Sequence, residues 1–105
     1  MKDISSRAEV ALDYPDKTYI GIFERHSRYS AGFDDKGVVI KLEHPGEERK
    51  VVDIHLAYAL FGDILHDLAA SKDALARVAE VERKHLVEAL KRAAHDLNQH
   101  SGKSR

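Results

Sequence analysis

Two pairs of acidic and histidine residues have the spacing of ligands in a helical metal site. They are Asp63 with His66 and Glu82 with His85, and two residues separate the members of each pair. One turn of helix brings both members to the same side, as in the carboxylate-bridged metal centres of helix bundles. However, Asp63 and His66 lie opposite the apolar stripe of their predicted helix, and the additional glutamates of such a centre are missing. We therefore predict no metal site and no cofactor.

Glu82 interrupts the apolar stripe of the last predicted helix, between Ala79 and Leu86. A carboxylate in that position must be paired, close to solvent or protonated, because burying an unpaired charge is costly. The preferred interpretation is that Glu82 reaches the edge of the stripe and pairs with a cation of its own chain. Two alternatives stay open: a polar contact across a subunit interface, which would fix the register of two helices, and a catalytic carboxylate.

The outer face of the last predicted hairpin carries a candidate ligand-binding group of four residues: Lys41, Arg49, Asp53 and His55. An acid, a base and two cations on one exposed face could bind an anionic ligand or transfer protons. The same residues could equally form cross-strand ion pairs on a solvated face. Asp53 is also a candidate helix cap, and in that role it is not available for catalysis.

The composition excludes several classes of chemistry. With no cysteine among 105 residues, the chain has no disulfides, thiolate ligands or thiol nucleophiles, and a reducing compartment is favoured. The 17 basic and 18 acidic residues are interspersed without a basic cluster, which argues against nucleic-acid binding. No serine lies in the glycine-flanked turn of a hydrolase nucleophile.

The chain shows no secretory signal and no membrane-spanning segment. Its first residues are polar, and no stretch approaches the ~20 apolar residues that cross a bilayer. Together with the lack of cysteine, this pattern predicts a cytoplasmic protein with no membrane partner.

The hydrophobic pattern predicts a single α+β domain over residues 1–105, with an antiparallel meander of about five strands at about 6–53. Residues 6–14 alternate apolar and polar side chains, as expected of a half-buried strand. Short turn signals separate this strand from those that follow. The inward face of the strand at 18–23 stays open between two pairs of residues: Ile20 with Ile22, and Tyr19 with Phe23.

From Ile54 the hydrophobic period changes from two to about 3.6. This change predicts two amphipathic helices at about 54–71 and 73–98, packed on one face of the sheet, with Asp53 and Asp73 as N-caps. One continuous helix is the alternative, since the two stripes are almost in phase. A turn is preferred because a single rod could not fold back over the sheet. The polar tail at 99–105 is predicted to be frayed.

The last predicted helix is about 39 Å long, which is longer than a compact domain of this size is wide. One end of its apolar stripe should therefore lack a partner within the domain. We predict a non-enzymatic module that self-associates as a homodimer through its helices or binds another protein. The expected interface residues share the stripe: Val78, Glu82, Leu86, Ala89 and Leu90. The alternative is a small-ligand-binding protein or minor enzyme, which would use the cup between sheet and helices or the exposed face with Arg49, Asp53 and His55.

Overall fold

The computed structural model describes the backbone of residues 1–103 and the side chains of residues 1–99. The chain forms two compact units, Met1–Ile64 and Leu65–Arg105, which we call unit 1 and unit 2. That the whole chain is one domain stays a prediction. The tail predicted to fray at 99–105 has a helical backbone as far as Lys103, so the helix continues beyond its predicted end at residue 98; residues 104 and 105 lie outside the described part of the chain.

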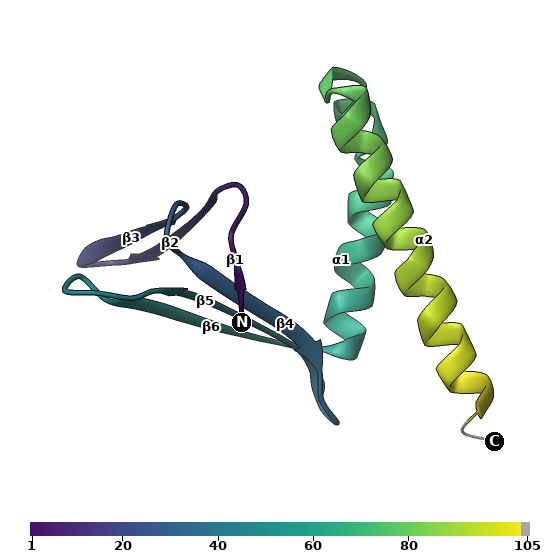
Figure 1. Cartoon of the computed structure of the whole chain (residues 1–105), viewed down its shortest axis with the longest axis horizontal. Helices are drawn as coiled ribbons and strands as arrows, with labels where there is room; N and C mark the ends of the chain where they lie inside the picture. The colour runs from purple at the N-terminus through teal and green to yellow at the C-terminus, as the bar shows by residue number, and fades with distance from the viewer. Residues whose placement is uncertain (104–105) are drawn as a thin grey trace. The chain divides into compact units, whose positions relative to one another are not determined.

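Unit 1 contains six strands in two antiparallel sheets (Figure 1). A four-stranded sheet has the order β1-β4-β5-β6, and β2 pairs with β3 in a two-stranded sheet. The strand bounds are Lys2–Asp3 for β1, Ala8–Tyr14 for β2, Lys17–Phe23 for β3, Arg28–Phe33 for β4, Gly37–His44 for β5 and Lys50–Ala57 for β6. The α+β class is confirmed, whereas the single five-strand meander is wrong, because β3 does not pair with β4.

The N-terminus takes the sheet edge that β3 would occupy in a meander. The two residues of β1 pair with the first two residues of β4 in antiparallel register. The chain leaves β3 through a turn in which the Ser27 N–H donates to the Glu24 carbonyl, at 2.9 Å. His26 in this turn has a φ of 68°, in the left-handed region, which redirects the backbone. The β2–β3 hairpin is thereby separated from the four-stranded sheet.

β5 and β6 form a ladder in which each strand contributes eight residues. β6 continues past Asp53 because Ile54 and Leu56 keep the period of two and lie opposite apolar residues of β5. The helix predicted from residue 54 therefore begins only at Tyr58. Asp53 lies within β6, so its predicted role as an N-cap is wrong.

Among the described residues, two hydrophobic side chains are buried, and both belong to unit 1: Phe23, which is 0% exposed, and Val38, which is 6% exposed. The β2–β3 register places Tyr19 opposite Leu12, and Phe23 shares that face because it follows at an even spacing. Ile20 lies on the other face and is 64% exposed. The inward face of β3, which the sequence did not decide, is therefore the face with Tyr19 and Phe23.

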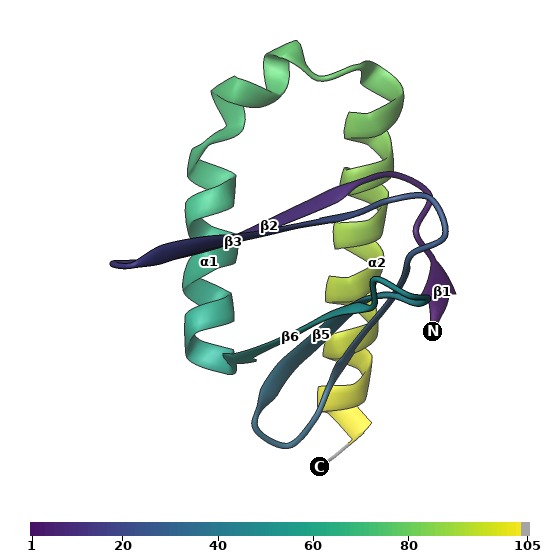
Figure 2. The same cartoon turned by 90° about the vertical axis from the view of Figure 1, so that its left-hand side faces the viewer.

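The helical part of the chain is interrupted twice. It consists of α1 (Tyr58–Ala70), a short 3₁₀ helix η1 (Lys72–Arg77) and α2 (Glu80–Lys103), and Figure 2 shows η1 and the extended link that precedes α2. Val78 is extended, with ψ of 140°, so one continuous helix over 54–98 is wrong and α2 begins later than predicted. The packing of the helices on one face of the sheet stays a prediction. Within residues 1–103, no helix combines the length and apolar character needed to cross a membrane.

Candidate functional site

Three of the four candidate residues on the last hairpin share one face of the sheet. Lys41 and Asp53 lie directly opposite each other in the β5–β6 ladder, and His55 follows on the same face opposite Val39. Arg49 lies outside β6, in the connection from β5, so the ladder does not fix its position. No salt bridge among the described residues includes any of the four. The ligand-binding role of this face stays a prediction.

His55 also lines a shallow groove of about 200 Å³ beside the β4–β5 turn, together with Asp34 and Lys36. The Asp34 carboxylate accepts hydrogen bonds from the backbone N–H groups of Lys36, at 2.8 Å, and Gly37, at 2.9 Å. These two bonds, and more weakly the charge of His55, lower the pKa of Asp34, against a small opposing effect of desolvation. The Tyr58 hydroxyl donates to the Asp34 carbonyl, so the same turn holds the start of α1. The Asp34 carboxylate is therefore engaged in the turn.

We expect the Asp34 turn to weaken in acid. Because folding lowers the pKa of Asp34, its carboxylate stabilises the fold above the unfolded-state pKa, and this contribution is lost as the pH falls through the folded-state pKa. Asp34→Asn keeps an oxygen acceptor but cannot titrate. Its melting temperature should lie below that of the wild type at about pH 6 and converge with it as the pH falls through the folded-state pKa of Asp34.

The neighbouring residue provides the control for this pH series. Asp35 lies in the same turn, but none of the hydrogen bonds found among the described residues involves its side chain. Asp35→Asn should therefore follow the wild-type melting temperature at every pH. A gap between wild type and Asp34→Asn that is the same at both ends of the series would contradict the role of the Asp34 charge.

Ser27 and His44 have the separation of a nucleophile and its base. The Ser27 Oγ lies 3.0 Å from His44 Nδ1. However, Ser27 is only 1% exposed, so a substrate cannot reach its hydroxyl. The contact satisfies two polar groups where the β3–β4 turn meets β5, and we interpret it as structural.

The predicted interface residues lie on α2, with the exception of Val78. Val78 precedes α2 and its extended backbone takes it out of the helical stripe. Leu86 and Leu90 are 49% and 56% exposed. They belong to a seam of residues at alternating spacings of four and three: Ala79, Arg83, Leu86, Leu90, Ala93 and Leu97. This spacing is typical of helices that pair along their length, and Glu82 and Ala89 border the seam.

Unit 2 does not supply a core for this seam. None of its side chains over residues 65–99 is buried. These exposures refer to the whole chain, and they could only be larger in unit 2 by itself. Residues that bury the seam must therefore come from outside unit 2. The sequence analysis did not identify Arg83 as an interface residue, although the alternating spacing of four and three residues includes it.

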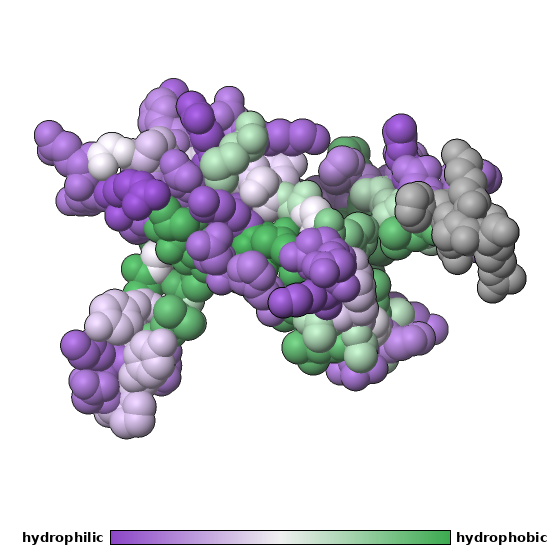
Figure 3. Space-filling model, turned by 90° about the horizontal axis from the view of Figure 1, so that it is seen from below, coloured by the Kyte–Doolittle hydropathy of each residue, from purple (hydrophilic) through white to green (hydrophobic). Residues whose placement is uncertain are grey.

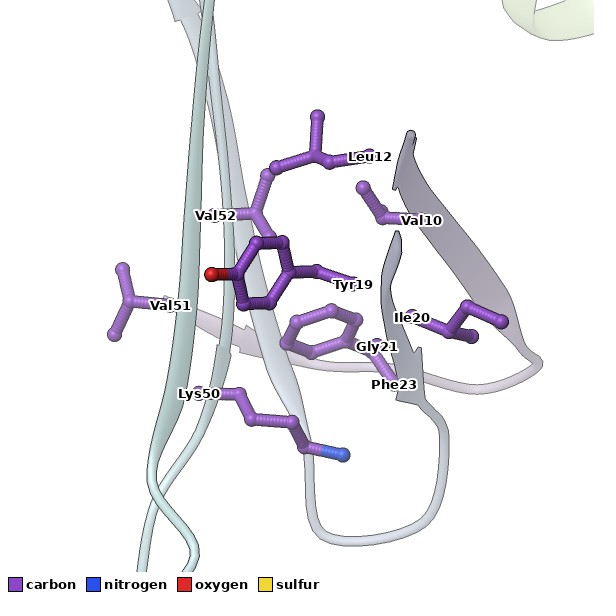
Figure 4. Close-up of a pocket in the computed structure, with 9 residues that line it drawn as sticks. All are labelled: Val10, Leu12, Tyr19, Ile20, Gly21, Phe23, Lys50, Val51 and Val52. Carbon is purple, nitrogen blue, oxygen red and sulfur yellow. The ribbon is translucent and has the colours of Figure 1, made fainter. Parts of the chain in front are cut away.

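A cleft of about 320 Å³ separates the β2–β3 hairpin from β6 and was not predicted from the sequence. Tyr19 and Phe23 project from the hairpin toward β6, and Val52 projects back toward them (Figure 4). Figure 3 shows hydrophobic side chains gathered where the two sheets diverge. The Lys50 side chain extends from β6 toward the hairpin (Figure 4). Its Nζ donates a hydrogen bond to the Ile22 carbonyl at 2.9 Å and lies 5.5 Å from the centroid of the Phe23 ring.

Comparisons with known proteins add no constraint on function. No protein-family model matches the chain, and no curated protein or solved structure matches it significantly. Over the residues whose side chains are described, no three acidic or histidine residues come together as metal ligands. Only the geometry of unit 1 and of unit 2 therefore indicates a function.

Proposed function

We propose that the protein is a non-enzymatic module that forms a homodimer through α2. The observation that carries this proposal is the exposed seam on α2, which unit 2 does not cover by itself. α2 has 24 residues and is thus about 36 Å long, long enough to present five turns of the seam to a partner helix. Exposed apolar side chains aligned along one side of a helix are typical of a protein–protein interface.

A second copy of the chain is the partner that fits the charges in and beside the seam. Glu82 and Arg83 are adjacent, have opposite charges and take part in no salt bridge among the described residues. Under two-fold symmetry, a contact from one residue to another recurs in the reverse direction. Glu82 of each copy can therefore pair with Arg83 of the other, and such a polar contact would fix the register of the two helices.

We expect light scattering after gel filtration to give twice the chain mass of 11.8 kDa at high micromolar concentration. Leu86→Asp places a charge in the seam and should weaken the dimer by roughly 30-fold or more, as expected for a central interface residue. Val81→Asp is the matched control, because Val81 is 80% exposed and lies on the opposite side of α2. It should leave the mass unchanged, and circular dichroism should show the same helix content in both variants.

A charge exchange tests the partner's identity. Glu82→Arg should weaken the dimer, and the double variant Glu82→Arg, Arg83→Glu should restore it, because each copy again offers an acid to a base. A wild-type protein that stays monomeric at high micromolar concentration would overturn the proposal. The seam would then not be an interface between copies of this chain.

A further inference from the structure

We propose that the cleft between the β2–β3 hairpin and β6 binds a small carboxylate with an unbranched apolar body, such as a medium-chain fatty acid. The volume of about 320 Å³ lies at the lower end of the range for ligand pockets. Its walls are formed by aliphatic and aromatic side chains from both sheets: Val10, Leu12, Tyr19, Phe23 and Val52. An elongated apolar ligand is the shape and chemistry that such walls favour.

The charge that selects a carboxylate comes from Lys50. Its ammonium group has three N–H donors, and one of them is used by the Ile22 carbonyl. The others can donate to an anion in the cleft, on the side of the ammonium group that does not face the buried Phe23 ring. A charge-assisted hydrogen bond is stronger than a neutral one, so the anion should bind more tightly than a neutral ligand of the same length.

The polar atoms of the cleft are few, which also limits the choice of ligand. The Tyr19 side chain extends across the cleft toward β6 and carries the phenol oxygen with it (Figure 4). Apart from Lys50, the residues that line the cleft carry no charged side chain. A phosphate or a dicarboxylate would therefore leave charge without a partner, whereas a single carboxylate at Lys50 is matched.

Binding can be measured with octanoate and its neutral analogue octanamide, using ¹H–¹⁵N NMR spectra of the whole chain. Octanoate should bind with a dissociation constant of roughly 0.1–1 mM and shift the amides of Gly21 and Val52, which line the cleft. Octanamide should bind about tenfold more weakly. Equal binding of the two ligands, no binding, or shifts confined to other parts of the chain would overturn the proposal.

Variants of Lys50 separate the charge from the packing. Lys50→Gln should weaken octanoate binding about tenfold and leave octanamide binding unchanged, while Lys50→Arg should keep the preference for octanoate. Lys41→Gln is the matched control, because Lys41 lies on the opposite face of the β5–β6 ladder. Equal effects of Lys50→Gln and Lys41→Gln would mean that net charge, not the cleft, determines binding, and would overturn the proposal.

A carboxylate could also come from the C-terminus of a peptide. N-acetylphenylalanine mimics such a terminus, since it joins an amide, an apolar side chain and a carboxylate. It should bind more weakly than octanoate, because the cleft walls offer few partners for its amide. Tighter binding of N-acetylphenylalanine would assign the cleft to a peptide terminus and overturn the assignment to a free fatty acid.

Discussion

Replacing Phe23 with alanine is expected to lower the free energy of unfolding by about 4 kcal/mol. Phe23 is the largest fully buried side chain among the described residues and joins the two sheets of unit 1. Its ring also covers Gly21, where an added Cβ would lie 3.2 Å from the ring. The cost therefore includes both lost apolar burial and a residual cavity.

Ile20→Ala provides the matched control for Phe23→Ala, since both residues belong to β3. Ile20 is 64% exposed on the outer face, so its truncation should change the free energy of unfolding by less than about 1 kcal/mol. Urea denaturation monitored by circular dichroism measures both variants. A loss at Phe23 no larger than the loss at Ile20 would mean that the hairpin is not held to β6 by this ring.

The strands were predictable because their signals are local. Alternating side chains and turn residues locate β2 and β3 within two residues of their observed ends. β1 was missed, since Lys2 and Asp3 have no pattern and their pairing depends on residues far along the chain. The division into two sheets was missed for the same reason, because it depends on β1 and on the turn at His26.

The boundary between β6 and α1 shows where two periods compete. Ile54 and Leu56 satisfy the period of a strand, and Ala57 and the residues after it satisfy that of a helix, so the sequence alone places the change too early. Pairing with β5 decides the outcome, because the extended backbone of residues 54–57 continues the antiparallel ladder with β5 to its end at Gly37.

The candidate sites also differ in whether local sequence patterns could predict them. The pairing of Lys41 with Asp53 follows from a hairpin register, and a hairpin is a local structure. The cleft depends on how the β2–β3 hairpin faces β6, which no local pattern determines. One wall of the cleft could have been predicted from the sequence. The two-residue turn at Pro15 and Asp16 fixes the register of the β2–β3 hairpin, and this register places Tyr19 on the same face as Leu12.

Gly37→Ala is expected to lower the free energy of unfolding by about 3 kcal/mol. A Cβ at this position would lie 2.0 Å from the Leu56 carbonyl oxygen and 3.0 Å from the Ala57 Cα. Both atoms belong to the backbone of β6, so relief requires the end of the β5–β6 ladder to separate. The same movement would disturb the turn at Asp34, whose carboxylate accepts the Gly37 N–H.

Gly32→Ala separates the effect of space from the general effect of replacing a strand glycine. Gly32 lies in β4 of the same sheet, and no atom lies within 4 Å of an added Cβ. This variant should be neutral or more stable by up to about 1 kcal/mol, because alanine restricts the unfolded chain more than glycine does. Urea denaturation compares the two variants directly. If both lose stability equally, close approach of the β6 backbone is not the reason for glycine at position 37; if neither does, the ladder opens there at little cost.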